Sequence, residues 1–442
     1  MINSFPYILA FLITGVALIV ILTTHFKVPA FFALLLTCLF VGLGIQLPLG
    51  EVISTIKDGF GNILKSLGLI IVLGTTLGLL LEYTGSTTVM AAFILNKLGS
   101  RRAPLAMSIT GFIVGLPIFC DSGYIVLSGL NKSIAKRTLI PMSVMSVSLA
   151  TGLYAVHCLV PPHPGSAGAA GIIGVDFGKL ILVGIVVAIP AMFVGNYWAR
   201  YAGRTVADTA VEDVIEKNRI ENYPSLVKAF LPVVVPIVLI GIKSFFTSST
   251  TMSHEWLSFL LSLGDPVMAL SIGVLLAFNC NRSWKKAETT KILQDATEKA
   301  GGILMIIGMG GGFGAILAVS KVGEHFSQSM ALGSMGIFFP FLLTSVLKTA
   351  QGSSTVAIIT AASIVLPLLP ALGLSSETGR LFCVLAMGAG SMMISHANDA
   401  YFWVIAKFSG LEMKTMLKVY SVATLLMGLT TITMVYILSK LF

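Results

Sequence analysis

Charged residues are scarce in this chain of 442 residues. Only 11% are Asp, Glu, Lys or Arg, against about 25% in ordinary soluble proteins, and 56% are hydrophobic. This scarcity excludes a water-facing globular protein of this size, and the mean hydropathy of +0.94 excludes a disordered chain. The chain is therefore predicted to lie in a lipid bilayer. Its net charge of +9 requires no nucleic acid partner, because membrane proteins concentrate Lys and Arg in cytoplasmic loops.

Cysteine is equally scarce. The five cysteines are an odd number, lie in or beside apolar stretches and have no CxxC spacing, so we expect small buried residues rather than disulfides or metal ligands. They are Cys38, Cys120, Cys158, Cys280 and Cys383. His157, Cys158 and His163 lack a third strong ligand nearby, so we predict no metal site.

Long apolar runs dominate the chain instead. The first, Phe5 to Thr24, is long enough to cross a bilayer and has no Lys or Arg before it, which predicts a retained helix with its N-terminus outside. Glu51 to Lys65 mixes charged and apolar residues, which is typical of a helix lying along the interface. Further spans are predicted at 30–47, 66–82, 104–119, 139–157, 172–195, 229–246, 257–278, 301–319, 331–347, 354–372, 380–396 and 417–440.

A polar stretch near the middle divides the chain into two similar halves. We predict an N-terminal repeat at 1–198, a polar cytoplasmic linker at 199–226 and a C-terminal repeat at 227–442. Gly74 and Gly78 correspond to Gly310 and Gly314, at an offset of 236 residues, and two polar tracts match at nearly the same offset. Basic residues at 101–102 and 282–291 place those loops in the cytoplasm, so segments 47–65 and 280–300 would lie on opposite sides. This pattern predicts inverted-topology repeats.

Four polar tracts interrupt the apolar spans at membrane depth, where irregular backbone is tolerated only beside protein or a water-filled cavity. LPIFCDSGY (116–124) and KTAQGSSTVA (348–357) are typical of the tips of re-entrant hairpins. AVHCLVPPHPG (155–165) and SHANDAYFW (395–403) are typical of helices that unwind near mid-membrane. We therefore predict an all-α polytopic membrane protein with one re-entrant hairpin and one broken helix in each half.

Broken helices suit an anionic substrate, because their N-terminal ends present free N–H groups and a positive dipole, while neutral side chains bind hydroxyls. The predicted substrate-binding residues are Ser122, Gly123, His157, His163, Gly352, Ser353, Ser354, Thr355, His396 and Asn398. Lys348 either reaches the membrane interface or binds a carboxylate.

Asp121 and Asp399 are carboxylates inside membrane segments, which makes each a functional candidate. Coupling to a proton gradient needs a protonatable group, and the candidates are Asp121, Asp399, His157 and His396. Either aspartate could instead be a helix N-cap.

Together these tracts resemble the gluconate permease (gluconate:proton symporter) family, within the ion-transporter superfamily. The resemblance covers nearly the whole chain and rests chiefly on HCLVPPHPG at His157 to Gly165, with FCDSGY, AQGSSTVA and SHANDAYFW in support. It implies an elevator-type transporter, a homodimer in the bacterial inner membrane, importing gluconate or a related hydroxy acid by proton symport. It implies no cofactor other than H⁺ as coupling ion.

Three alternatives remain. A sodium-coupled carrier of a small organic anion, with the same fold, would hold Na⁺ at carbonyls near Gly352 and Ala397, and a D-serine or glycerate carrier of the same family is the other form of this alternative. A membrane-embedded enzyme is disfavoured because no HExxH or GxSxG motif is present. A channel is disfavoured by the paired occluding hairpins.

Overall fold

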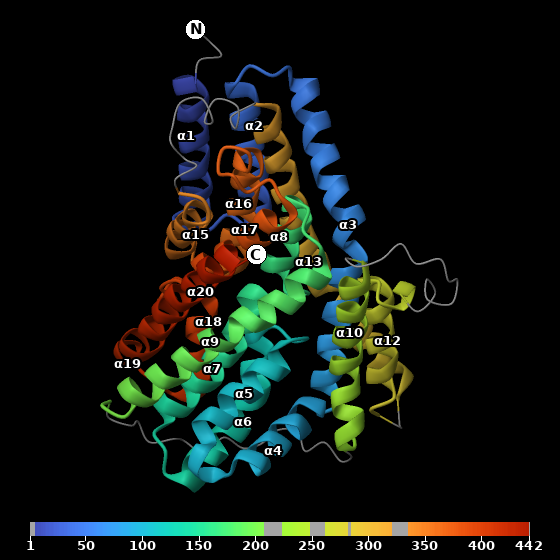
Figure 1. Ribbon diagram of the computed structural model, residues 1–442, viewed down its shortest axis with the longest axis vertical. Coiled ribbons are helices and arrows are strands. Elements are labelled where there is room, and N and C mark those ends of the chain that lie inside the picture. The colour runs from blue at the N-terminus through green and yellow to red at the C-terminus, as the bar shows by residue number, and fades with distance from the viewer. Residues whose placement is uncertain (1–4, 207–222, 248–260, 282–283, 321–334, 442) are drawn as a thin grey trace.

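Helices form nearly all of the computed structural model, which describes residues 5–206, 223–247, 261–281, 284–320 and 335–441 (Figure 1). Within these residues there is no strand. Six of the helical segments described are long and apolar enough to span a membrane by length and composition. The predicted all-α class is therefore confirmed.

The N-terminal half contains nine α-helices within its described residues. They are α1 (Phe5–Thr24), α2 (Ala30–Gly44), α3 (Leu49–Tyr83), α4 (Ser86–Leu98), α5 (Ala103–Gly115), α6 (Cys120–Thr138), α7 (Met142–Leu159), α8 (Pro164–Ile173) and α9 (Phe177–Gly203), with a 3₁₀ turn, η1 (Ser100–Arg102), before α5. The separate interfacial helix predicted at Glu51 to Lys65 is wrong. That segment is the first part of the continuous, 35-residue α3, because no proline interrupts residues 49–83.

The C-terminal half follows the same succession of long helix, hairpin and broken helix. Its described elements are α10 (Leu226–Thr247), α12 (Pro266–Phe278), α13 (Lys286–Val319), α15 (Phe338–Gln351), α16 (Ser354–Val365), η3 (Leu366–Leu368), α17 (Glu377–Met392), α18 (Ala400–Ser409), α19 (Met413–Met416), the π-turn η4 (Leu417–Ser421) and α20 (Val422–Leu441). The predicted spans at 257–278 and 331–347 begin outside the described residues. Most of the predicted linker, residues 207–222, also lies outside the described residues, and α9 extends into its first part as far as Gly203.

The long helices α3 and α13 pack along each other (Figure 1). Glycine permits this contact, because a Cβ on Gly59 would lie 2.5 Å from the backbone oxygen of Gly311. The glycines shared by the two halves also face other helices. A Cβ on Gly78 would lie 2.7 Å from the oxygen of Pro117, and one on Gly310 would lie 2.2 Å from the Ile359 side chain. The glycine runs thus serve close helix packing.

Both hairpins and both broken helices occur where the polar tracts predicted a break. The first hairpin, α5 and α6, turns at residues 116–119, and the second, α15 and α16, turns at Gly352 and Ser353. The first broken helix, α7 and α8, is interrupted at residues 160–163, and the second, α17 and α18, at residues 393–399. Prolines end α7, and Gly352 turns the second hairpin with a left-handed φ of +80°.

Candidate functional site

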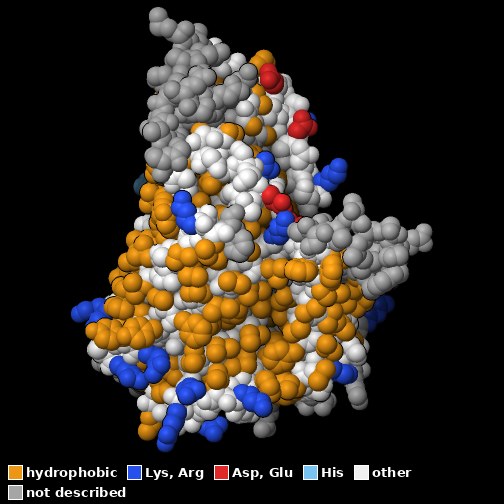
Figure 2. All heavy atoms as spheres, in the orientation of Figure 1, with side chains coloured by type: hydrophobic (Ala, Val, Ile, Leu, Met, Phe, Trp, Pro, Cys, Tyr) orange, Lys and Arg blue, Asp and Glu red, His pale blue; other side chains and the backbone are white. Residues whose placement is uncertain are grey.

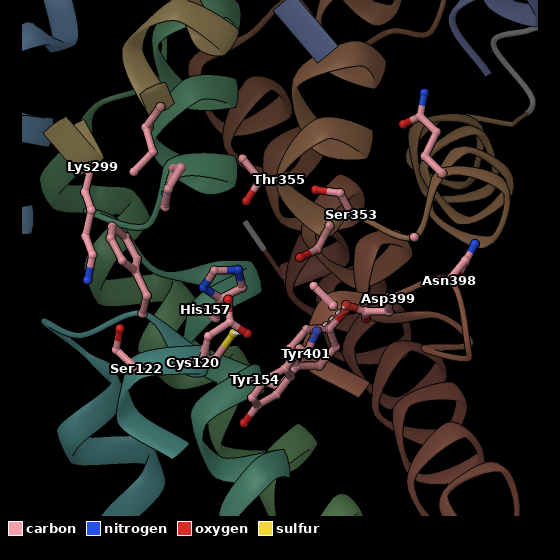
Figure 3. Close-up of a pocket in the computed structure, with 18 residues that line it drawn as sticks. Cys120, Ser122, Tyr154, His157, Lys299, Ser353, Thr355, Asn398, Asp399 and Tyr401 are labelled. Atoms are coloured by element: carbon pink, nitrogen blue, oxygen red, sulfur yellow. Dashed lines mark hydrogen bonds between the residues drawn. The ribbon is translucent and has the colours of Figure 1, made fainter. Parts of the chain in front are cut away.

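The four breaks meet around one cavity of about 480 Å³ (Figure 3). Ser122 and Lys299 lie on one side of it, Asn398 and Asp399 lie on the other, and His157 lies between them. Residues more than 200 positions apart in the sequence therefore line the same cavity, and its size suits a small organic molecule.

Four helix N-termini point into this cavity. Residues of the first turns of α6, α16 and α18 line it, as does Pro164, the first residue of α8. Each helix begins with backbone N–H groups that have no carbonyl partner within the helix, and with the positive end of its dipole. Four such ends around one space make it a favourable site for an anion.

Most of the residues predicted from the breaks line the cavity. They are Asp121, Ser122, His157, Gly352, Ser353, Ser354, Thr355, Asn398 and Asp399. Among them, His157 has a buried Nδ1 atom with no hydrogen-bond partner among the described residues. Ser353 is the N-cap of α16 and accepts a hydrogen bond from the amide of Val356 at 3.3 Å.

Three predicted residues lie outside the lining. Gly123 is buried, and a Cβ there would lie 2.7 Å from the Leu153 side chain. His163 donates from Nε2 to the oxygen of Gly115 at 2.7 Å, and His396 donates from Nε2 to the oxygen of Thr349 at 3.0 Å. In both hydrogen bonds the imidazole is the donor, because a backbone carbonyl can only accept. Both imidazoles therefore bind carbonyls near helix ends.

Asn398 has a structural role beside its place in the lining. Its amide nitrogen donates to the oxygens of Thr349, at 2.8 Å, and Ala350, at 3.2 Å. These are carbonyls of the last turn of α15, which has no helical partner for them. Asn398 and His396 therefore fasten the second broken helix to the second hairpin.

The two aspartates differ in their surroundings. Asp399 Oδ2 forms a 2.7 Å ion pair with Lys348 Nζ, whose side chain is fully buried, and also accepts from the hydroxyl of Ser395. Asp399 Oδ1 caps α18 by accepting from the amide of Tyr401 at 3.0 Å. The N-cap interpretation is thus confirmed for Asp399. Asp121 lies in the first turn of α6 and is not its N-cap, which is Phe119.

Asp121 has no cationic partner among the residues that the structure describes. Its one recorded side-chain contact is with Cys120 Sγ at 3.8 Å, and it forms no ion pair with any residue in the described ranges. Lys348, by contrast, is fully buried, so the prediction that it reaches the interface is wrong, and the carboxylate that it binds is that of Asp399. Its ammonium group binds Asp399 and the oxygen of Gly352, at 2.9 Å, inside the protein.

Two carbonyls in the regions predicted for a sodium-coupled carrier accept hydrogen bonds. Gly352 O accepts from Lys348 Nζ, and Ala397 O accepts from Trp403 Nε1 at 2.7 Å. Elsewhere in the described part of the chain, no three His, Cys, Asp or Glu side chains gather as a metal ion would require.

Several lining residues were not predicted. Lys299 belongs to α13 and lies in the segment 280–300, which the sequence predicts to be a cytoplasmic loop, and Gln351 lies one residue before the predicted tip glycine. Both amide atoms of Gln351 are buried without a partner among the described residues. Tyr154 and Tyr401 stack at 5.7 Å beneath the site. The KTAQGSST tract contained Gln351 and could have indicated it, whereas no local pattern indicated Lys299.

A polytopic helical fold with hairpin tips and broken helices around one polar cavity defines a membrane transporter. The family model for GntP family permeases matches residues 7–441, so the chain belongs to that family. It is a multi-pass permease of the bacterial inner membrane and not an enzyme.

Relatives in other bacteria agree with this assignment, and a solved structure has a similar fold. The chain is 32% identical to the gluconate permease of Pseudomonas aeruginosa, covering 97% of this chain and 96% of the relative. It is 33% identical to the high-affinity gluconate transporter of Escherichia coli K12, covering 92% and 93%. The fold is similar to that of the YdaH transporter of Alcanivorax borkumensis, with a TM-score of 0.64, 14% identity and 89% of each chain covered.

Proposed function

We propose that this permease imports gluconate or a related sugar acid by proton symport. The observation that carries the proposal is the convergence of four helix N-termini on one polar cavity. A carboxylate bound there would gain from the dipole ends. Ser, Thr and Gln side chains in the lining suit hydroxyl groups. Relatives at about 30% identity are named gluconate transporters, which supports the same substrate class.

Asp121 is the proton-coupling residue in this proposal. An ionised carboxylate without a cationic partner is costly at membrane depth, and Asp121 lines the cavity without one. Asp399 has its charge balanced by Lys348, so taking up a proton there would leave a buried ammonium group unpaired. His157 remains a second candidate because it faces the cavity, and His396 is less suitable because Thr349 O holds its Nε2–H.

Proton coupling is favoured over sodium coupling. The carbonyls of Gly352 and Ala397, where sodium was considered, are occupied by donors, one of them an ammonium group. A sodium ion at Gly352 O would be repelled by the ammonium group of Lys348, which binds the same oxygen and pairs with Asp399.

We further propose an elevator movement of two inverted repeats, 1–198 and 227–442, with 199–226 as a cytoplasmic linker. In this scheme α3 and α13 stay fixed, while the hairpins and broken helices carry the cavity across the membrane. Glycines support such sliding, because Gly78 and Gly310 present almost no side chain to Pro117 and Ile359. The homodimer implied by the family resemblance belongs to the same proposal.

Uptake into proteoliposomes tests the substrate and the coupling. With an imposed inward proton gradient, labelled gluconate should accumulate, and an uncoupler should abolish accumulation. Replacing Na⁺ by choline should have no effect. Competition by a panel of hydroxy acids would define the preferred substrate. Uptake that ignores the uncoupler and requires Na⁺ would refute proton symport.

Asp121→Asn tests the assigned proton carrier, with Asp295→Asn, an exposed aspartate on α13, as the matched control. We expect Asp121→Asn to bind gluconate and exchange it across the membrane but to lose accumulation driven by the pH gradient. The control should accumulate gluconate as the unmodified protein does. Accumulation retained in Asp121→Asn would exclude this role.

A further inference from the structure

A second cavity, separate from the transport site, lies at the opposite end of the first hairpin. Its volume is about 450 Å³. It is lined by four arginines from two parts of the chain: Arg101 and Arg102 precede α5, and Arg200 and Arg204 lie at the end of α9. The proposed transport of a sugar acid uses none of these residues.

The four guanidinium groups have no counter-charge in the described part of the chain. No Asp or Glu lines the cavity, and none of the four arginines forms an ion pair or side-chain hydrogen bond with a described residue. Like charges gathered around one space repel each other. Cytoplasmic loops are generally basic, but that preference is satisfied by dispersed charges and does not require four arginines around one cavity.

Four helix ends lie at the cavity, namely the N-termini of α5 and α7 and the C-termini of α6 and α9. α5 begins at Ala103 and α7 begins at Met142, and the residues beside both N-termini line the cavity. The dipole of α9 accounts for Arg200 and Arg204, because cations are favourable at a helix C-terminus. Arg101 and Arg102 stand at the N-terminus of α5, where the dipole disfavours a cation. An anion in the cavity would reverse that penalty, and phosphate is the usual anion at such helix ends.

The rest of the lining is apolar. Leu105, Leu139, Ile140 and Val144 contribute, and Leu139 is 90% exposed with a left-handed φ of 54°. Figure 2 shows Lys and Arg side chains gathered at this lower end of the molecule, below a broad belt of hydrophobic side chains. In a membrane protein such a boundary lies at the level of the lipid headgroups. A ligand with both a phosphate and an apolar chain fits these surroundings better than a soluble anion.

We propose that this cavity binds the headgroup of an anionic phospholipid from the cytoplasmic leaflet, with the phosphodiester between the four arginines and an acyl chain against the Leu139 side. Phosphodiester oxygens accept paired hydrogen bonds from guanidinium groups. Basic pockets between membrane helices are suited to such lipids. The proposal is independent of the transported substrate.

Native mass spectrometry of the purified full chain in a neutral detergent tests the proposal. Phosphatidylglycerol should be retained and should raise the thermal unfolding temperature, whereas phosphatidylcholine should not. Excess glycerol 3-phosphate or inorganic phosphate distinguishes the sources of phosphate. Displacement of the lipid by either at equal concentration would mean a free-phosphate site and would overturn the assignment to lipid. These measurements need no variant.

The double variant Arg101→Gln/Arg204→Gln should bind phosphatidylglycerol about 25-fold more weakly, at about fivefold for each arginine near an anionic headgroup. The control Lys132→Gln/Arg137→Gln removes the same charge from α6 without touching the cavity lining, and it should lose less than about twofold. Gluconate uptake by both variants would establish that they fold.

Two results would overturn the proposal. The first is equal phosphatidylglycerol binding by the arginine variant and the control. The second is a wild-type protein that binds phosphatidylglycerol no more tightly than phosphatidylcholine.

Discussion

The buried ion pair between Lys348 and Asp399 should respond to mutation very differently when one partner is removed and when both are. Lys348 is fully buried, and its Nζ lies 2.7 Å from Asp399 Oδ2. The pair joins the second hairpin to the second broken helix. Lys348→Met removes the cation and Asp399→Asn removes the anion, while Asn retains the ability to cap α18.

Each single substitution leaves a buried charge without its partner, which costs about 3–5 kcal/mol of unfolding free energy. The two costs would sum to about 6–10 kcal/mol if the residues were independent. The double variant buries no charge and loses chiefly the hydrogen bond to Gly352 O, so we expect it to cost about 1–2 kcal/mol. The interaction energy should therefore exceed about 4 kcal/mol.

Equilibrium unfolding by SDS in mixed micelles, followed by tryptophan fluorescence, measures the three variants in one cycle. The exposed pair of Lys179 and Glu377, whose side chains are 33% and 66% exposed, provides the matched control. Its cycle, with Lys179→Met and Glu377→Gln, should give about 0–1 kcal/mol. Additive costs at Lys348 and Asp399, or equal interaction energies in the two cycles, would refute the reasoning.

Two further substitutions test the cavity wall. Gly352→Ala should abolish gluconate binding, measured by calorimetry, because the residue has φ +80° and a Cβ would lie 2.1 Å from Asn398 O. The control is Gly373→Ala, where φ is +69° but the space around the residue is open. This variant should lose only about 1–2 kcal/mol of stability. Lys299→Gln should raise the KM for gluconate about two- to fivefold with little change in kcat, because an exposed cation contributes about 1 kcal/mol or less to the binding free energy of an anion. Lys299→Arg keeps the charge and should restore the KM. An unchanged KM in Lys299→Gln, or tight binding by Gly352→Ala, would contradict these assignments.

The sequence predicted the positions of all four breaks, because the signals for them are local. Pro161 and Pro162 cannot continue α7, and Gly352 alone in its tract tolerates the left-handed turn. Nine of the twelve residues proposed for binding or coupling line the cavity, because each lies within a few positions of a break. The prediction of a separate interfacial helix at Glu51 to Lys65 is wrong, because the pattern of charges does not reveal that the helix continues to Tyr83.

Side-chain partners were not predictable in the same way. His163, His396 and Asn398 were assigned to substrate as polar residues within breaks, yet each binds a helix-end carbonyl. Those carbonyls come from α5 and α15, which are 47 or more positions away in sequence. A polar residue near a break serves either the ligand or the backbone, and only its neighbours in space decide which.

By itself, the sequence determined that this protein lies in a membrane, where its helices are interrupted, and which polar residues stand at the interruptions. Apolar runs, prolines and glycines act on the chain within a few residues, so their effects can be predicted from the sequence alone. Only the tertiary structure decided that Lys348 neutralises Asp399 while Asp121 has no cationic partner among the described residues, that Lys299 reaches the first cavity, and that four arginines gather around a second one. Coulomb interactions depend on distance in space rather than along the chain, and folding sets those distances.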